Sequence, residues 1–397
     1  MFNNSMLGEI VKLLPRGEIK KIIKHHKGDR YRKTFTTWDH LTAMLTAKFA
    51  GLTSLRELEV TLNSNPRHHY HLNCDNVKRS TLSDANKNRD FSVFRDIATT
   101  MISHLGRQKQ PLERLVTVLD STLIHLDGRG HAWADATKSR LHNQGLKMHV
   151  QYNHSEDHIE YVEVGDATIN DVTVAQSIHL EENRIYVFDK GYCDYNWWKY
   201  VVDKGSTFVT RLKKNAAYTV VKQFEIAEAD KDVILKDQLI RLSNKHSKGK
   251  KGKKENELAE IELRLVEIQH PNGKETSFNI VTNAVDASAQ RIAGWYKERW
   301  SIELLFKWLK QNLKIKKFMG ESRNAIMIQL FVALIAYVLL KLYNGLVKEK
   351  GLRLKDVCTL IKSALFTRPK LQERQRERRR SWHSPSQQQL SLDLMPW

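Results

Sequence analysis

From Leu115 onwards the chain changes from a helical to a strand-forming pattern, and this change restricts the fold more than any other feature. Short apolar runs rich in β-branched residues predict strands, and amphipathic stretches between them predict helices. The sequence predicts strands at 115–120, 146–152 and 158–164, a helix at 174–180, a strand at 185–189, a helix at 195–202 and a strand at 206–213. This alternation predicts an α/β domain.

Two of the predicted strands end in an aspartate. L-V-T-V-L-D ends at Asp120, and I-Y-V-F-D ends at Asp189. The predicted order is that of an RNase H-like fold, in which these two strands are neighbours, so both aspartates would project from adjacent strand ends. One such aspartate is commonly a turn former, but two ahead of a third acid indicate a site. Asp127 and Asp194 lie beyond their strands and Glu298 falls on the apolar side of its helix, so these rivals are less favoured.

The third acid, Glu303, lies in the segment 296–317, which reads Y-K-E-R-W-S-I-E-L-L-F-K-W-L-K-Q-N-L-K-I-K-K. As a single α-helix, this segment has an apolar side suited to a core and an opposite polar face. The polar face carries Tyr296, Arg299, Glu303, Lys307, Lys310, Lys314 and Lys317. The apolar side carries Ile302, Leu304, Leu305, Trp308, Leu309, Leu313 and Ile315.

The polar face has two interpretations. It can be solvated helix surface on which Glu303 pairs with Arg299 and Lys307, and each such pair stabilises a helix by only about 0.2–0.5 kcal/mol. However, the lysines of this row stand at repelling distances, whereas the phosphates of a polyanion would neutralise them. A lone carboxylate facing phosphates suggests a metal ligand. We therefore favour a DNA-binding face with Glu303 as a metal ligand.

The spacing Tyr-x2-Arg-x3-Glu-x6-Lys, met by Tyr296, Arg299, Glu303 and Lys310, resembles the signature of the insertion-sequence transposases of the IS-four family. These enzymes are DDE transposases. The runs D-K-G-Y at 189–192 and F-V-T-R at 208–211 are also similar to the region around the family's second aspartate. The resemblance implies a transposase with an RNase H-like catalytic core.

The resemblance assigns roles to these residues. It implies that Asp120, Asp189 and Glu303 are catalytic and bind metal. Three carboxylates suit two Mg²⁺ ions about 3.5–4 Å apart, with Mn²⁺ as a substitute. The expected contacts to DNA come from Tyr296, Arg299, Lys307, Lys310, Lys314, Lys317 and Arg211. Such contacts to phosphates position DNA and carry little sequence information.

The composition agrees with a nucleic-acid partner. The 397 residues include 65 Lys and Arg against 45 Asp and Glu, a net charge of +20. Three cysteines without repeated spacing indicate neither a disulfide framework nor a paired-cysteine zinc site, and fit a reducing cytosol. The apolar run 325–340 is short for a membrane span and predicts a buried helix. We expect no membrane association and a cytoplasmic, nucleoid-associated bacterial protein.

Five segments are expected. Residues 1–110 are expected to form a helical N-terminal DNA-binding domain. Its first predicted helix is capped near Thr36 and ends at Gly51, the next begins with a capping box of Ser54 and Glu57, and a third begins at Ser80 or Ser83. The other four are the first part of the RNase H-like core at 111–213, a β-rich insertion with a basic loop at 214–285, the helical second part of the core at 286–366, and a disordered basic tail at 367–397.

Two side-chain groups stay open. The ligand types at His68, His69, His71 and Cys74 lack a second cluster, so DNA contact by a polar loop is favoured over zinc. In some family members a tryptophan of the insertion stacks on a flipped base, but residues 214–285 contain no Trp. The aromatic residues that could substitute are Tyr218, Phe224, Phe278, Trp197, Trp198 and Trp300.

Taken together, the sequence predicts cut-and-paste transposition of the protein's own insertion sequence at terminal inverted repeats. The expected partners are double-stranded DNA and a second copy of the chain. The run Q-L-S-L-D, from Gln389 to Asp393, resembles the peptide that docks on the replicative sliding clamp, although an aromatic residue is usual in place of Asp393. The alternatives are an RNase H-like nuclease of repair or recombination, and an inactive DNA-binding protein.

Overall fold

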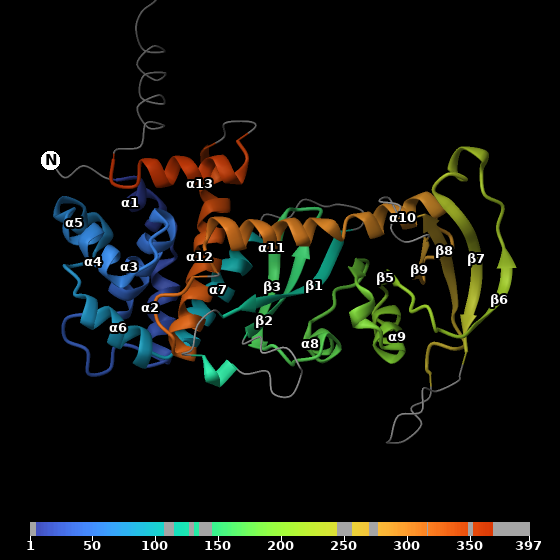
Figure 1. Cartoon of the computed structure of the whole chain (residues 1–397), viewed down its shortest axis with the longest axis horizontal. Coiled ribbons are helices and arrows are strands. Elements are labelled where there is room, and N and C mark those ends of the chain that lie inside the picture. Colours follow the sequence, from blue (N-terminus) through green and yellow to red (C-terminus); the bar gives the residue numbers. More distant parts are fainter. Residues whose placement is uncertain are drawn as a thin grey trace, which may run out of the picture. The chain divides into compact units, whose positions relative to one another are not determined.

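The computed structural model describes residues 5–106, 115–126, 131–134, 145–243, 256–269, 277–315, 317–347 and 352–367. The predicted basic loop at 247–254, the tail from residue 368 and the clamp-like run at 389–393 lie outside these residues. Within them the chain forms two compact units (Figure 1). The first comprises Met1–Ile97, Phe318–Gly320 and Asn324–Trp397, and the second comprises Ala98–Lys317 and Glu321–Arg323.

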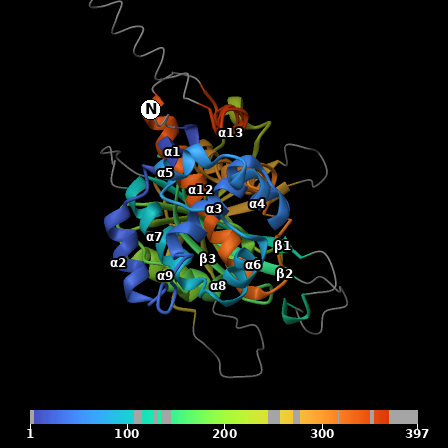
Figure 2. The same cartoon turned by 90° about the vertical axis from the view of Figure 1, so that its left-hand side faces the viewer.

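The first unit is helical. Its helices are α1 (Met6–Val11), α2 (Arg16–His25), α3 (Thr37–Ala50), α4 (Leu55–Asn63), η1 (Pro66–His68), α5 (His69–Leu72), α6 (Arg79–Asn88), the start of α7 (Ser92–Leu105), α12 (Arg323–Val347) and α13 (Leu354–Ser363). Figure 2 shows α12 among the N-terminal helices, with α2 and α7 on one side of it and α4 and α6 on the other.

The predicted helix signals in this unit are confirmed. The side chain of Thr36 accepts from the amide of Asp39 in a capping box, and Gly51 ends α3 with a φ of 70°. Ser54 and Glu57 form the capping box of α4. Helix α6 starts at Arg79, close to the predicted Ser80. The histidine cluster lies on η1 and α5 rather than on a loop, so that part of the prediction is wrong.

Helix α12 forms the centre of the first unit. Its stretch Arg323–Leu346 is long and apolar enough to cross a membrane, but 89% of its most apolar window is buried inside the protein. Gln329, which interrupts the apolar run 325–340, is fully buried. Its amide oxygen accepts from the backbone N–H of Met319 at 2.8 Å, and its amide nitrogen donates to the carbonyl of Ala325 at 2.9 Å. Because its amide has hydrogen-bond partners, Gln329 can be buried, which agrees with the predicted core helix.

A buried histidine in α3 makes the first unit sensitive to acid. His40 is fully buried, its Nε2 lies 2.8 Å from Oδ1 of Asn86, and its ring packs on Phe94. Burial, with a contribution from Arg89, lowers the pKa of His40 to about 3, although the bond to Asn86 opposes this shift. Below pH 6.5 the unfolded chain binds a proton that the folded chain excludes, so stability falls as the pH drops from 6.5 towards 3.

We predict that His40→Gln reduces the pH dependence of stability. Between pH 6.5 and pH 5 the wild type should lose about 1–2 kcal/mol of unfolding free energy through this group, at about 1.4 kcal/mol per pH unit. The variant should lack this component, whatever its stability at pH 7. Urea unfolding at several pH values measures the difference, with the exposed His25→Gln as control. Equal pH slopes for wild type and His40→Gln would contradict the prediction.

The second unit is built on one nine-stranded mixed sheet with the order β3-β2-β1-β4-β5-β9-β8-β7-β6. The strands are β1 (Val116–His125), β2 (Gly145–Asn153), β3 (His158–Asp166), β4 (Ile185–Phe188), β5 (Thr207–Arg211), β6 (Tyr218–Gln223), β7 (Ile234–Leu242), β8 (Glu262–Gln269) and β9 (Ser277–Thr282). Strand β1 pairs antiparallel with β2 and parallel with β4, which pairs parallel with β5. The chain thus has the predicted mixed α/β class, with helices before the sheet.

The strands expected in the insertion continue this same sheet. Strand β9 pairs antiparallel with β5, and β8, β7 and β6 follow in antiparallel order. The runs D-V-I-L at 232–235 and Q-L-I-R-L at 238–242, which have the pattern of two short strands, meet in the single strand β7. A register shift between Ile234 and Lys236 interrupts the pairing of that strand with β8, which explains why its apolar pattern is read as two pieces.

Helices cover both faces of the sheet. Side chains of α8 (Asp171–Ser177) and α9 (Tyr195–Asp203) pack with Leu119, Phe188 and Phe208 in one core, where the ring of Trp198 stacks on Phe208. Helix α11 (Trp300–Asn312) packs on β1, and α10 (Ala289–Lys297) packs on β4, β5, β7, β8 and β9. Because alternate residues of a strand face opposite sides, Asp120, next to Leu119, faces α11.

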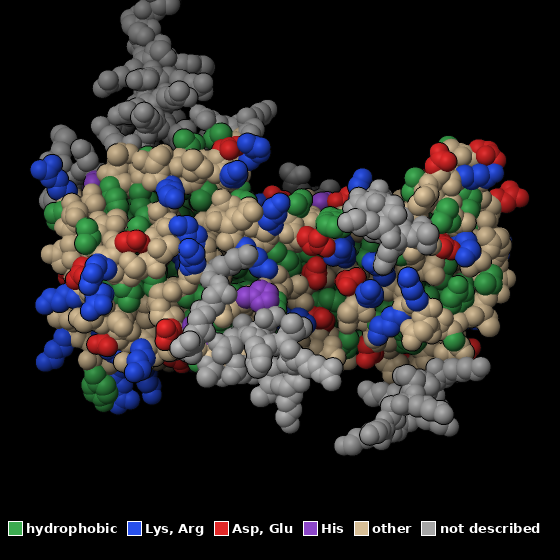
Figure 3. Space-filling view, in the orientation of Figure 1, with side chains coloured by type: hydrophobic (Ala, Val, Ile, Leu, Met, Phe, Trp, Pro, Cys, Tyr) green, Lys and Arg blue, Asp and Glu red, His purple; other side chains and the backbone are tan. Residues whose placement is uncertain are grey.

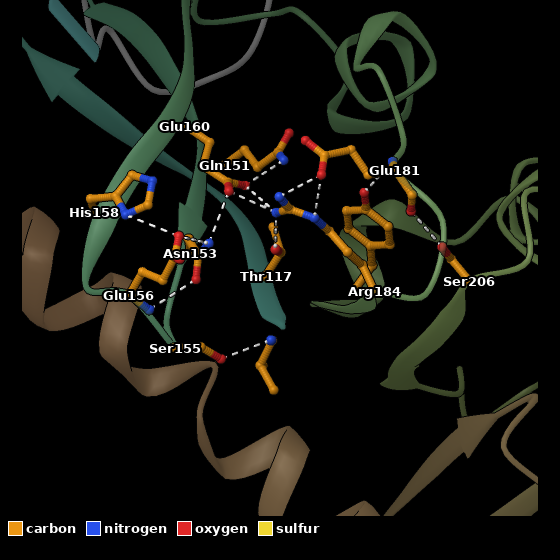
Figure 4. A network of polar contacts seen from close by, with 12 residues as sticks. Thr117, Gln151, Asn153, Ser155, Glu156, His158, Glu160, Glu181, Arg184 and Ser206 are labelled. Carbon is orange, nitrogen blue, oxygen red and sulfur yellow. Dashed lines mark hydrogen bonds and ion pairs between the residues drawn. The ribbon is translucent and has the colours of Figure 1, made fainter. Parts of the chain in front are cut away.

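A buried arginine connects β1 and β3 with the start of β4 (Figure 4). The side chain of Arg184 is 3% exposed, and its Nη1 lies 2.7 Å from Oε1 of Glu160 and 3.0 Å from Oγ1 of Thr117. Its Nη2 donates to Glu181 at 2.7 Å. Thr117 lies on β1, Glu160 on β3 and Arg184 just before β4, so one guanidinium connects elements that are distant in sequence.

We predict that Arg184→Met lowers the unfolding free energy by about 3–5 kcal/mol, because it leaves Glu160 as a partly buried charge without its cationic partner. The double variant Arg184→Met, Glu160→Gln should recover part of this loss. Denaturant unfolding measures both. The matched control is Arg241→Met, which removes a half-exposed pair with Glu262 in the same sheet and should cost less than about 1 kcal/mol. A similar loss in both single variants would contradict the prediction.

Candidate active site

Asp120 and Asp189 lie side by side because β1 and β4 are parallel. The last pair in their ladder is Leu119 with Phe188, and each is followed directly by an aspartate. The predicted end of β1 at Asp120 is wrong, since the strand continues to His125. This extension is paired only with β2, from Asp120 opposite Val150 to His125 opposite Gly145, so Asp120 marks the end of the parallel ladder rather than of the strand.

The side chain of Arg299 connects Asp120 with Glu303. Its Nη1 lies 3.3 Å from Oδ2 of Asp120, and its Nη2 lies 2.8 Å from Oε1 of Glu303. Arg299 is only 12% exposed, so these are partly buried ion pairs. The Arg299–Glu303 pair proposed for a solvated helix is therefore present, but it lies against β1 rather than on an open surface.

The three carboxylates are close enough to influence one another. Burial raises the pKa of Asp120 to about 6, the amide of Ser121 and Arg299 oppose this shift, and the charges of Asp189 and Glu303 add to it. Ser121 donates its backbone N–H to Oδ1 of Asp120 at 2.8 Å. A cation bound between these acids would relieve their repulsion.

The single helix expected over 296–317 is two helices, so this prediction is wrong. After α10 the backbone hydrogen bonds change to the i→i−3 spacing of a 3-10 turn. The N–H of Ser301 donates to the carbonyl of Glu298, and the N–H of Ile302 donates to the carbonyl of Arg299. Helix α11 then ends at Asn312, and Lys314 has a φ of 47°. The left-handed backbone at Lys314 cannot continue the helix, so Lys314 and Lys317 do not extend the polar row.

The apolar and polar sides also differ from the prediction in two places. Leu304 is 64% exposed instead of contributing to the core. Tyr296, expected on the polar face, is buried on α10, and its ring packs on Phe278 at 5.6 Å. Burial raises the pKa of Tyr296 to about 12, so its phenol stays protonated. The change of helix geometry after Lys297 turns Tyr296 into the core.

A pocket of ≈ 490 Å³ lies in front of Asp120. It is lined by Asp120, Ser121, Thr122, Glu303, Phe306, Lys307, Lys310 and Gln311. Nζ of Lys310 donates to Oγ1 of Thr122 at 2.6 Å, which ties α11 to β1 beside the acids, and Lys307 is exposed at the rim. In the space-filling view, Lys and Arg side chains are spread over the surfaces of both units (Figure 3).

The remaining candidates lie in different settings. Arg211, at the end of β5, lies over the ring of Phe278 at 4.5 Å. Trp197 and Trp198 are buried in the core, whereas Trp300 is 55% exposed at the start of α11. His69 bonds the carbonyl of Leu62. These observations leave Trp300 as the accessible tryptophan among the three considered.

The sequence reading missed the polar residues behind the acids. Asp171, Lys147 and His149 lie next to Ser121 in the structure. Asp171 follows the N-cap Asn170, where an acid in the first turn of a helix is common. Lys147 and His149 occupy alternating positions of strand β2, as any pair of residues on one face of a strand does. Since none of them belongs to a spaced motif, no local signal distinguishes them.

Comparison with known proteins agrees with this geometry. The family described as Transposase DDE domain matches residues 111–339, more than half of the chain. The chain belongs to the DDE transposase family. A second family, described as Domain of unknown function (DUF4372), matches residues 2–73, within the helical unit. The resemblance to DDE transposases is therefore confirmed, and the enzyme acts on DNA in transposition.

Curated relatives are also named as transposases. Protein y4zB of Sinorhizobium fredii is 38% identical over 66% of this chain and 70% of its own length. The transposase for insertion sequence element IS5377 of Geobacillus stearothermophilus is 27% identical over 74% of this chain and 72% of its own. That for IS4SA of Synechocystis is 28% identical over 77% of this chain and 80% of its own.

DDE transposases depend on divalent metal ions, and the residues present fit such ions. Among the described residues, no three His, Cys, Asp or Glu side chains approach closely enough to hold a metal as they stand. However, Arg299 lies between Asp120 and Glu303 and supplies the positive charge there. The carboxylates of Asp120, Asp189 and Glu303 offer the oxygen ligands that divalent ions of this class prefer.

We predict that Arg299→Gln increases the stabilisation of the transposase by Mn²⁺. The variant loses the guanidinium that neutralises Asp120 and Glu303, so the acids repel more without metal and gain more from it. Thermal unfolding with and without Mn²⁺ measures the gain in melting temperature. Arg291→Gln, which changes an exposed arginine of α10, is the control. A smaller gain in Arg299→Gln than in wild type would contradict the prediction.

Proposed function

We propose that this transposase moves its own insertion sequence by cut-and-paste transposition, cleaving DNA at terminal inverted repeats and joining the freed ends to a target. The observation that carries the proposal is the arrangement of Asp120 beside Asp189, with Arg299 connecting Asp120 to Glu303. Arg299 and Glu303 also belong to the Tyr-x2-Arg-x3-Glu-x6-Lys spacing, which favours the IS-four branch of the family.

Asp120, Asp189 and Glu303 are the proposed catalytic residues and would hold the metal ions. Mg²⁺ is the proposed ion, with Mn²⁺ as a substitute. Bound divalent ions would stabilise the charge that develops on the phosphate oxygens and would favour deprotonation of the attacking water or 3′ hydroxyl. Without metal, Arg299 pairs with Asp120 and Glu303, so the charges of these two carboxylates are compensated.

The basic residues of α11 would bind the DNA backbone. Lys310, held by Thr122, and the exposed Lys307 border the pocket that contains Asp120, where phosphates beside the scissile bond would lie. Arg299 would also contact the DNA backbone once a metal ion replaces it between Asp120 and Glu303. Tyr296 is buried, so it would support Arg299 rather than touch phosphate.

Lys314, Lys317 and Arg211 do not line the pocket that contains Asp120. Lys317 is exposed beyond the end of α11, and Lys314 is half-buried. Arg211 lies over Phe278, as the end of β5 meets β9. We propose that Lys314, Lys317 and Arg211 contact DNA farther from the scissile phosphate.

The strand order supports an RNase H-like core. Strands β3, β2 and β1 are antiparallel neighbours, and β1, β4 and β5 are parallel, with α8 and α9 between the later strands in sequence. Strands β6 to β9 extend this sheet and correspond to the proposed insertion at 214–285. We propose 1–110 as the DNA-binding domain, 111–213 and 286–366 as the two core parts, and 367–397 as the tail, whereas α12 from Asn324 and α13 belong to the compact helical unit.

The proposed partners are both inverted repeats, target DNA and a second copy of the chain that brings the two ends together. Docking on the sliding clamp through 389–393 stays a proposal on residues outside the described ranges. The proposed location is the bacterial cytoplasm at the nucleoid, where the DNA substrate lies.

We predict that Glu303→Gln abolishes cleavage and leaves DNA binding within about twofold of wild type, because the amide keeps the shape of the side chain and removes a charged ligand. The substrate is a linear fragment with the protein's own gene and several hundred flanking base pairs, incubated with Mg²⁺ or Mn²⁺. Break mapping shows the products. Paired breaks at flanking inverted repeats would support cut-and-paste transposition.

The matched control is Glu298→Gln, one turn earlier in the chain. Glu298 pairs with His154 rather than with Asp120, so its variant should cleave like wild type. Cleavage by Glu303→Gln, or an equal loss of DNA binding, would overturn the ligand assignment. Binding without breaks in wild type, with either metal, would favour a DNA-binding protein instead.

A further inference from the structure

A fourth carboxylate lies behind the proposed metal site, on the opposite face of β1. Asp171 is the first residue of α8, and its side chain is 21% exposed. Its Oδ1 accepts a hydrogen bond from Oγ of Ser121 at 2.7 Å and an ion pair from Nζ of Lys147 at 2.8 Å. Nδ1 of His149 lies 3.4 Å from the same oxygen. One oxygen thus joins α8 to β1 and β2.

Ser121 connects Asp171 to Asp120. The backbone N–H of Ser121 donates to Oδ1 of Asp120, while its hydroxyl donates to Asp171. Because successive strand side chains point to opposite faces, Asp120 faces α11 and Ser121 faces α8. The position of Ser121 therefore determines where the carboxylate of Asp120 is held, and Asp171 holds Ser121.

The turn after Asp189 packs against the same carboxylate. A Cβ on Gly191 would lie 3.2 Å from Oδ2 of Asp171, a tight contact, so the backbone of this turn lies close to the carboxylate. The amide of Tyr192 donates to the carbonyl of Asp189 at 3.0 Å, and the ring of Tyr192 is 3% exposed in the core below. Asp171 thus borders both segments that carry the first two acids.

The charge of Asp171 is balanced on its own face of the sheet. Lys147 is its cationic partner and also donates to the carbonyl of Ile169. His149 lies directly opposite Ser121 in the β1–β2 ladder and is 2% exposed. Burial, with Lys147, lowers the pKa of His149 to about 4 although Asp171 opposes the shift, so the ring is neutral at pH 7. Asp171 therefore does not compete for Arg299.

We propose that Asp171 is a positioning residue for the metal site, acting on Asp120 through Ser121 and on the turn of Asp189 through its contact with Gly191. This inference rests on the proposed function, in which Asp120 and Asp189 bind metal. Asp171 contacts neither acid directly and faces away from α11, so it is not a catalytic residue. Groups that orient metal ligands commonly change metal affinity 10–100-fold when they are removed.

The test measures Mn²⁺ binding to the protein–DNA complex from the electron paramagnetic resonance signal of free Mn²⁺. Asp171→Asn and Ser121→Ala should each weaken Mn²⁺ binding about tenfold or more and leave metal-free DNA affinity unchanged. Because the contribution of Ser121 depends on its bond to Asp171, the double variant should bind Mn²⁺ no more weakly than Asp171→Asn alone. Ser121→Thr, which keeps the hydroxyl, should bind Mn²⁺ like wild type.

The matched control is Asp203→Asn, which removes an exposed carboxylate paired with Lys199 on α9. If Asp171→Asn lowers the melting temperature but binds Mn²⁺ as tightly as the control, the inference is overturned, because a purely structural role of Asp171 predicts that result. If Asp171→Asn does not fold, the Mn²⁺ affinity of Ser121→Ala is compared with that of the control instead. Loss of cleavage in Glu303→Gln beside unchanged Mn²⁺ affinity in both variants would sink this inference and leave the proposed function standing.

Discussion

The parallel pairing of β1 with β4 is the constraint on which the site depends. Asp120 and Asp189 are 69 residues apart, yet the ladder places each directly after the last pair, Leu119 with Phe188. A parallel pair requires a long crossover, and here the crossover contains β2, β3 and α8. The same segment that makes the pairing possible also supplies Lys147, His149 and Asp171 behind it.

The two faces of β1 have separate charge balances. On one face, Arg299 pairs with Asp120 and Glu303, and Lys310 bonds Thr122. On the other face, Lys147 pairs with Asp171. Partly buried carboxylates are costly without a partner. In the proposed function, a metal ion would replace Arg299 between Asp120 and Glu303, while Lys147 remains paired with Asp171.

Much of the fold could be predicted because its signals are local. The capping boxes at Thr36 and Ser54 need only three or four residues, and the strands around Asp120 and Asp189 are short β-branched runs. The predictions failed where a distant partner decides the outcome. Strand β1 continues past Asp120 because β2 pairs with it, and Leu304 is exposed although its position in the helix is apolar.

The sequence by itself determined the order of strands and helices, the three acids and the spacing around Glu303, since each depends on residue type and local periodicity. Tertiary structure alone decided that Arg299 joins Asp120 to Glu303, that Tyr296 is buried, and that Asp171 lies behind Ser121. The contact of Arg299 with Asp120 joins residues 179 positions apart, and that of Ser121 with Asp171 joins residues 50 positions apart. Their formation depends on how strands and helices pack, which no local pattern of side chains encodes.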